Sequence, residues 1–161
     1  MTRFDEHTSE QIRAHRETVL LRLLLRVQQI ETAELVRRLR ALGHDDVRTS
    51  YIGLLGNIDT EGTRLVTLAQ RTGNTRQAAS QMVTEIEGRG YLERTPDPDD
   101  KRAVLVRHTA AGRRLLNDAL ESMAEIEGEY EALVGRQALA AVKQALATIA
   151  EGVAPESRLE L

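Results

Sequence analysis

Hydrophobic residues recur at intervals of three and four along the first 42 residues, which is the spacing of one face of an α-helix. The pattern extends from Ile12 to Leu42, and Thr8 with Gln11 has the form of a capping box at its start. Gly43 comes directly after the last apolar position and predicts the end of the helix. We therefore expect one long helix over 8–42, whose wide apolar face needs a partner surface within the chain or on another subunit.

The middle of the chain has shorter apolar patterns that are separated by polar and glycine-containing turns. They predict, in order, a helix over 49–57, a turn over 59–62, a strand over 64–66, and helices over 67–72 and 75–88. We expect Thr49 to cap the first of these helices. Gly73 and Asn74 form a tight turn between the last two, and Asn74 could cap the final helix with Gln77 at its third position. This order is that of a helix-turn-helix.

A β-hairpin is predicted next, because strand-like residues lie on both sides of a six-residue turn over 96–101 that contains two of the three prolines. From Thr109 the helical period returns and continues almost to the end of the chain, with a break near Gly128 or Gly135. The predicted fold class is mainly α with a small β-hairpin wing: a winged helix-turn-helix domain with long helices on both sides.

The charge of the whole chain disfavours nucleic acid, but its distribution reverses that inference. The 161 residues include 22 Lys and Arg against 25 Asp and Glu, a net charge of -3. Residues 64–114 contain ten basic and six acidic residues, whereas 1–63 and 115–161 both have an acidic excess. The positive charge is thus concentrated on the helix-turn-helix and hairpin, where attraction to phosphates would need it.

The predicted helix over 75–88 has a polar side made of the residue types that contact base edges and phosphates in a major groove. Arg76 could bind guanine through two hydrogen bonds, and Gln77 or Gln81 could do the same to adenine. The alternative is an ordinary solvated helix face, which would be the better interpretation of an isolated helix. The adjoining hairpin and the local positive charge favour the DNA-reading interpretation.

These segments resemble the MarR family of winged-helix transcriptional regulators. The resemblance lies in three runs, Leu68–Val83, Glu87–Arg94 and Asp97–Gly112, and is strongest over 65–116. Its most specific element is Asp100 with Arg102 in the hairpin, where the family's Arg enters a minor groove and the Asp helps to hold it. A surface salt bridge in a hairpin turn is the alternative for this pair. Val66 and Asn74 depart from the family pattern, which leaves the start of each helix open.

The resemblance implies a set of DNA-contacting residues on the helix and the wing: Thr75, Arg76, Gln77, Ser80, Gln81, Thr84, Arg94, Asp100, Lys101 and Arg102. It further implies a homodimer held by interlocked terminal helices, which would place two reading helices about 34 Å apart on a pseudo-palindromic site. The implied function is that of a bacterial, ligand-responsive repressor that binds double-stranded DNA. The alternative is a winged-helix module that binds protein and not DNA.

The expected domain organisation follows from this resemblance. It comprises an N-terminal dimerisation helix over 8–48, the winged helix-turn-helix over 49–108, C-terminal dimerisation helices over 109–152, and a loose tail over 153–161. An intramolecular helical bundle is the alternative to the dimer. We prefer the dimer because one small winged domain cannot cover so much aliphatic helix.

A small-molecule effector, such as an aromatic anion, is the remaining partner that the resemblance implies. His15, Arg22 and Tyr51 are candidate pocket residues, since a cation among leucines could pair with a carboxylate; alternatively, Arg22 snorkels to solvent and His15 is simply exposed. We expect no cofactor, no metal site and no catalytic residue, because the usual motifs are missing. The lack of cysteine excludes sensing by thiol oxidation. The lack of a signal peptide or membrane span predicts a cytoplasmic protein.

Overall fold

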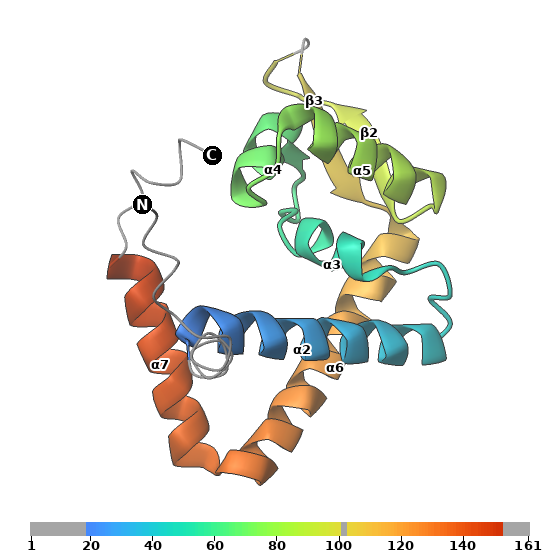
Figure 1. Cartoon of the computed structure of the whole chain (residues 1–161). Helices are drawn as coiled ribbons and strands as arrows, with labels where there is room; N and C mark the ends of the chain where they lie inside the picture. The colour runs from blue at the N-terminus through green and yellow to red at the C-terminus, as the bar shows by residue number, and fades with distance from the viewer. Residues whose placement is uncertain (1–18, 101–102, 153–161) are drawn as a thin grey trace, which may run out of the picture. The chain divides into compact units, whose positions relative to one another are not determined.

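The computed structural model describes residues 19–100 and 103–152. The chain divides into two compact units, Met1–Glu34 and Leu35–Leu161, with the boundary inside the first described helix. The elements are, in chain order, α2 (Leu20–Ala41), α3 (Thr49–Leu55), β1 (Thr63–Arg64), α4 (Leu65–Arg71), α5 (Arg76–Gly88), β2 (Leu92–Pro96), β3 (Val104–His108), α6 (Ala110–Val134) and α7 (Arg136–Gly152) (Figure 1). The predicted fold class is therefore confirmed: the chain is mainly α with a small β-sheet.

Helix α2 supplies the long N-terminal helix that the apolar period predicts. The part of the prediction that covers residues 8–18 lies outside the described residues. From Leu20 to Ile30 the large apolar side chains of α2 are exposed, whereas Leu35, Val36 and Leu39 are buried. The helix ends at Ala41, followed by Gly43 with a φ of 94°.

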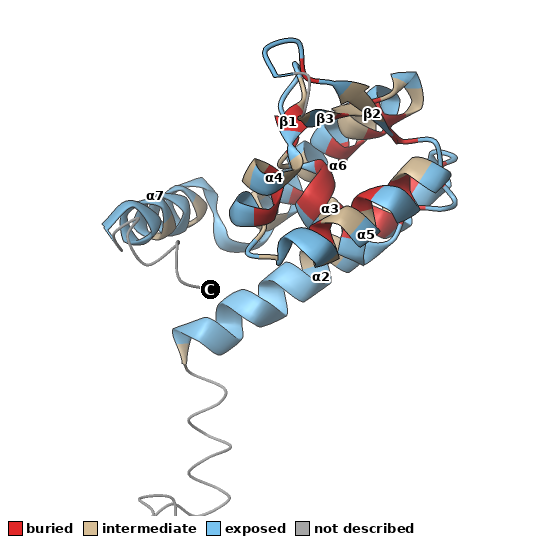
Figure 2. Ribbon diagram, turned by 90° about the horizontal axis from the view of Figure 1, so that it is seen from above, coloured by how far each residue is buried: buried red, intermediate tan, exposed pale blue. Residues whose placement is uncertain are grey.

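The core of the second unit lies among the end of α2, the helices α3 to α6 and the sheet (Figure 2). Its fully buried side chains are Leu39, Val47, Tyr51, Leu54, Leu68, Val83, Ile86, Leu92, Val106 and Ile126. Aliphatic residues dominate, in keeping with an aromatic content of 2%, and Tyr51 is the largest of these fully buried side chains. Because α5 contributes Ala79, Val83 and Ile86 to this core, its opposite side faces solvent.

The sheet has three antiparallel strands in the order β1-β3-β2, one more strand in the sheet than the predicted hairpin. In the hairpin, Leu92 pairs with His108 and Pro96 with Val104. On the other side of β3, Thr63 pairs with Val106. The strand predicted over 64–66 is thus Thr63–Arg64, and Leu65 already begins α4, two residues before its predicted start.

Two predicted N-caps are wrong. Residue Arg48, not Thr49, is the N-cap of α3, and it makes no side-chain capping hydrogen bond. The cap of α5 is Thr75, not Asn74: the Thr75 hydroxyl accepts a hydrogen bond from the Ala78 amide at 3.1 Å. The predicted turn at Gly73 is confirmed, since Gly73 has a φ of 64°, which suits a residue without a Cβ.

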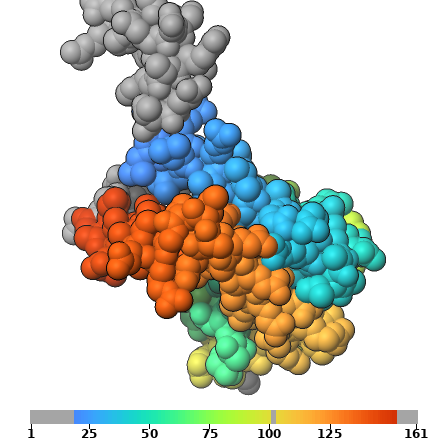
Figure 3. All heavy atoms as spheres, turned by 90° about the horizontal axis from the view of Figure 1, so that it is seen from below, coloured from blue at the N-terminus to red at the C-terminus, as the bar shows by residue number. Residues whose placement is uncertain are grey.

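The C-terminal half of the chain forms two helices, and the break between them is at Gly135 rather than at Gly128. Gly135 has a φ of 87°, whereas Gly128 lies inside α6. Thr109 caps α6 by accepting a hydrogen bond from the Gly112 amide at 3.0 Å. In the space-filling view, the end of α6 and the start of α7 form one continuous stretch of surface (Figure 3). No side chain of α7 is buried, and no helix among the described residues is long and apolar enough to cross a membrane.

Candidate nucleic-acid interface

The turn between α4 and α5 is closed by backbone hydrogen bonds and so fixes where α5 begins. The Asn74 amide donates to the Ala69 carbonyl at 2.9 Å, and the Asn74 side-chain amide donates to the Thr72 hydroxyl at 2.9 Å. Asn74 therefore stabilises the turn itself. Thr75 then caps α5, so that its hydroxyl already has a structural role.

The outward side of α5 carries the residues that the sequence selects for base contacts. Arg76, Gln77, Gln81 and Thr84 are exposed, and Ser80 is half-buried. The side chains of Arg76, Gln77 and Gln81 make no hydrogen bond or ion pair with another described residue. Their donors and acceptors are therefore available to a partner molecule.

The C-terminal part of α5 is anchored to α3 and to the segment that connects α2 with α3. Glu85 accepts hydrogen bonds from the Arg48 guanidinium at 2.5 Å and from the Tyr51 hydroxyl at 2.7 Å. Arg89 pairs with Asp46 at 2.7 Å. The Tyr51 hydrogen bond lowers the pKa of Glu85, while burial is the main cause that raises the pKa of Tyr51. These contacts hold the C-terminal end of α5 and involve none of Arg76, Gln77 and Gln81.

The end of β2, where the turn of the wing begins, is fixed by an ion pair that the sequence does not predict. The Arg64 Nε atom donates to the Asp97 carboxylate at 2.6 Å, although Asp97 is only 4% exposed. The Asp99 amide also donates to Asp97, at 2.9 Å. The hydrogen bond from the Asp99 amide and then the one from Arg64 are the largest causes that lower the pKa of Asp97. Asp97 thus ties the wing to Arg64, which is the N-cap residue of α4.

Residues at the tip of the wing are only partly described. Asp100 is exposed, and its carbonyl accepts a hydrogen bond from the Ala103 amide at 2.8 Å. The predicted contacts of Lys101 and Arg102 lie outside the described residues. The signal that could have identified Asp97 is its place between two prolines at the end of β2.

Arg94, another predicted DNA contact, lies between the wing and α5. Its guanidinium forms an ion pair with Glu87, and its Nη2 atom donates to the Ser80 carbonyl at 3.2 Å and to the Thr84 hydroxyl at 3.0 Å. A groove of about 530 Å³ opens beside it, between the starts of α4 and α5 and strand β3. Arg64, Arg76 and Arg94 all line this groove, so it has a basic wall.

The predicted effector residues are not brought together in one described pocket. His15 lies outside the described residues, and Arg22 is exposed on α2. Tyr51 is buried in the core, where its hydroxyl is already bound to Glu85. Tyr51 can therefore contact a ligand only if this part of the core opens.

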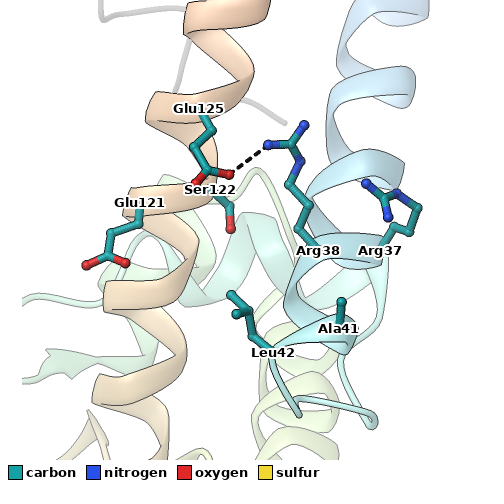
Figure 4. Close-up of a pocket in the computed structure, with 7 residues that line it drawn as sticks. All are labelled: Arg37, Arg38, Ala41, Leu42, Glu121, Ser122 and Glu125. Atoms are coloured by element: carbon teal, nitrogen blue, oxygen red, sulfur yellow. Dashed lines mark hydrogen bonds and ion pairs between the residues drawn. The ribbon is translucent and has the colours of Figure 1, made fainter.

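A separate groove of about 460 Å³ lies between the end of α2 and the middle of α6 (Figure 4). Arg38 crosses it and donates hydrogen bonds to Glu125 at 2.9 Å and to Glu129 at 2.6 Å. Nearer the start of α6, Asp118 is 2.6 Å from the Nε2 atom of His44. Within 19–100 and 103–152, no cluster of three or more histidine and carboxylate side chains could hold a metal ion.

Taken together, a glycine turn, a capped helix with an open polar face, and a three-stranded wing tied to that helix define a winged helix-turn-helix protein. A sequence model of the MarR family matches residues 45–103. Over these residues the chain is similar to the MarR family. No curated protein matches the sequence.

Solved structures of MarR-type regulators have the same fold. The transcriptional repressor CouR bound to a 23-mer DNA duplex is 26% identical, with a TM-score of 0.69 over 84% of this chain and 95% of that one. CouR from Rhodococcus jostii RHA1 bound to p-coumaroyl-CoA is also 26% identical, with a TM-score of 0.66 over 84% and 94%. A MarR C80S mutant from E. coli in complex with operator DNA is 23% identical and shows the likeness of fold, with a TM-score of 0.68 over 84% and 96%.

Proposed function

We propose that the chain is a sequence-specific transcriptional regulator that binds double-stranded DNA, and that it acts as a ligand-responsive repressor. The observation that carries this proposal is the outward face of α5, where the side chains of Arg76, Gln77 and Gln81 make no hydrogen bond or ion pair with another described residue, while the helix is anchored through Glu85. A helix held in this way presents its polar side chains to a major groove and loses little further conformational entropy on binding.

The proposed contacts differ in kind along the interface. Arg76, Gln77 and Gln81 would contact base edges, with Ser80, Thr75 and Thr84 beside them near the backbone. At the wing, Lys101 and Arg102 would contact the neighbouring groove and phosphates, with Asp100 holding Arg102. Arg94, whose guanidinium is bound within the chain, is treated separately below.

A binding experiment with a paired control tests this proposal. A duplex that binds the wild-type chain is first selected from a random library, and its dissociation constant is then measured for Arg76→Ala and Gln81→Ala. Each loss of a base contact should cost about 1–3 kcal/mol, and the sequence preference should relax at the bases that are read. Arg136→Ala is the control, because it removes the same charge from an 84% exposed side chain in α7.

The outcomes separate the two functions that the sequence left open. If no duplex is enriched above a scrambled pool, or if Arg76→Ala and Arg136→Ala bind the selected duplex equally well, α5 is not a DNA-reading helix. The protein-binding module would then be the better assignment. If only Arg76→Ala and Gln81→Ala lose affinity, the reading role of α5 is supported.

We also propose that the chain acts as a homodimer on a pseudo-palindromic site. Large apolar side chains remain exposed along the C-terminal helices, with Leu133 81% and Val142 53% exposed. Such a surface in a protein with a charged remainder is typical of a subunit interface. Sedimentation at micromolar concentration should give a dimer, and a monomer would contradict this part of the proposal.

The remaining parts of the proposal concern domains, effector and location. We retain 8–48 and 109–152 as dimerisation helices around the winged domain over 49–108, with a tail over 153–161. The effector would be a small molecule carrying a carboxylate, held by Arg22 and His15, and release of DNA on its addition is the test. We propose a cytoplasmic location, because a regulator must reach the chromosome, and we assign no catalytic residue.

A further inference from the structure

We propose that Arg94 acts as a positioning residue, which sets the distance between α5 and the wing through its ion pair with Glu87, and not as a contact to DNA. This inference rests on the proposed DNA-binding function. It changes the role of a residue whose charge and place in the wing would otherwise mark it as a phosphate contact.

The geometry joins one residue of the wing to two turns of α5. Arg94 lies in the middle of β2, opposite Val106 of β3. Its guanidinium pairs with Glu87 and donates to Ser80 and Thr84, so it follows one side of α5 over 80–87. The backbone amide of Arg94 also donates to the Glu87 carboxylate, at 3.2 Å. Glu87 therefore holds both the side chain and the backbone of the same wing residue.

The guanidinium of Arg94 has little capacity left for a phosphate. Three of its hydrogen bonds are made within the chain, one of them charge-assisted, and the side chain is 29% exposed. A phosphate oxygen would have to compete with the Glu87 carboxylate that is already in place. Arg76, which is exposed and has no partner within the described chain, is the contrasting case on the same helix.

A second ion pair shows why the position of the wing matters. Arg64 and Asp97 tie the end of β2 to the start of α4, while Arg94 and Glu87 tie its middle to α5. The wing is thus attached to both helices of the helix-turn-helix. Two DNA-contacting elements that must enter neighbouring grooves bind more tightly when their spacing is fixed beforehand, because less freedom is lost on binding.

The substitution Glu87→Gln distinguishes positioning from contact, because the two roles predict opposite signs. If Arg94 contacts a phosphate, loss of the Glu87 charge releases the Arg94 guanidinium and removes the repulsion between the Glu87 carboxylate and the DNA phosphates. Binding to DNA should then tighten and depend more steeply on salt. If Arg94 positions the wing, binding should weaken by about fivefold, the effect of a broken ion pair worth about 1 kcal/mol. The slope of log affinity against log salt for Glu87→Gln should then equal the slope for the control variant Glu93→Gln.

Glu93→Gln is the matched control for this experiment. Glu93 is the neighbour of Arg94 on β2, it is exposed, and its side chain has no ion pair or hydrogen bond with another described residue. It therefore removes the same charge next to Arg94 without breaking a described side-chain contact of the wing. The positioning role requires Glu87→Gln to bind more weakly than Glu93→Gln, on the duplex selected for the wild-type chain.

A charge exchange provides the second test and guards against simple unfolding. Arg94→Glu alone should weaken binding under either role, but combining it with Glu87→Arg restores an ion pair of the opposite sense. Under the positioning role the double variant recovers most of the lost affinity, whereas Glu87→Arg alone binds more weakly than wild type. If Glu87→Arg alone binds more tightly, or the double variant does not recover although circular dichroism shows it folded, the positioning role is wrong.

Failure of this inference is distinguishable from failure of the proposed function. If the wild-type chain binds its selected duplex and Glu87→Gln binds as tightly as Glu93→Gln or more tightly, Arg94 is not a positioning residue while DNA binding stands. If the wild-type chain binds no duplex, the proposed function is wrong and the positioning role falls with it.

Discussion

Gly112 lies where the first turn of α6 crosses the backbone at the start of the wing, and replacing it with alanine is expected to destabilise the fold. An added Cβ would lie 2.0 Å from the Tyr91 carbonyl oxygen and 3.2 Å from the Nδ1 atom of His108. The obstructing atom belongs to the backbone, and it also accepts a hydrogen bond from the Thr109 amide at 3.1 Å. The clash therefore cannot be relieved by turning a side chain.

The expected size of the effect follows from two opposing contributions. A contact this short requires the helix and the strand to separate by more than about 1 Å, and overpacking of this kind costs typically 1–3 kcal/mol, here at the upper end. Alanine gains about 1 kcal/mol over glycine in a helix interior, and less in a first turn. We therefore expect Gly112→Ala to lower the free energy of unfolding by about 2 kcal/mol.

The same helix offers a control with the opposite sign. Gly128 lies in the interior of α6, is exposed, and has no atom within 4 Å of an added Cβ. Gly128→Ala should therefore raise the free energy of unfolding by about 0.5–1 kcal/mol. At about 2–4 °C per kcal/mol for a chain of this size, the melting temperatures should move about 4–8 °C down for Gly112→Ala and about 1–4 °C up for Gly128→Ala.

Far-UV circular dichroism of thermal and urea unfolding measures both variants, at one fixed protein concentration because association would add to apparent stability. The midpoint gives the shift, and an unchanged m-value shows that the same surface is exposed on unfolding. If Gly112→Ala is as stable as wild type, or if both variants shift in the same direction, the close approach of α6 to Tyr91 is not a constraint on the fold.

Three further predictions use other contacts of the described chain. Thr75→Ala removes the cap of α5 and should cost about 1 kcal/mol in urea unfolding, whereas Thr49→Ala removes no capping bond, so equal losses would contradict the assignment. Burial lowers the pKa of His108, so the unfolded chain binds a proton at this side chain more readily than the folded chain does. The free energy of unfolding should therefore be constant above a pH of about 6.5 and decline as the pH falls below that value. His108→Leu should flatten this decline, and an unchanged slope would argue against the assignment to His108. Leu39→Ala should lower the free energy of unfolding by about 2–5 kcal/mol. Leu133→Ala changes a side chain that is 81% exposed, so it should leave the stability of the monomer nearly unchanged but shift sedimentation toward the monomer. No shift in sedimentation would count against the proposed interface.

Much of the fold can be predicted from the sequence because apolar periods are long and glycines mark the turns. Gly73 identifies the turn of the helix-turn-helix, and Pro96 with Pro98 identifies the turn of the wing. The bounds and the pairing of strand β1 could not be predicted. Two residues are too few to show an alternating pattern, and the strand pairs with β3, whose residues are about forty positions away in sequence. Caps are worth about 1 kcal/mol each, and tertiary contacts such as the one between Arg48 and Glu85 decide between neighbouring candidates.

Part of the candidate site can likewise be predicted from the sequence, and part of it cannot. The outward face of α5 follows from helical period alone, which is why Arg76, Gln77 and Gln81 could be selected before the fold was known. The ion pair between Arg64 and Asp97 could not be predicted, because it joins residues that are 33 positions apart in sequence. Composition marks Arg94 as a cation on the wing, but only the position of Glu87 beside it shows that this cation already has a partner.

Helix α7 has seventeen residues and buries none of them, so it draws no stability from a core of its own. In proteins most of the stability of a helix comes from packing of its apolar face against other elements. If a second copy covers it, the helix and the assembly form together, and the amount of competent regulator depends on how much protein the cell makes. At low abundance the concentration of dimer rises with the square of the monomer concentration, so that halving synthesis would reduce operator occupancy more than twofold. Supply of the protein would then control the switch alongside any small molecule.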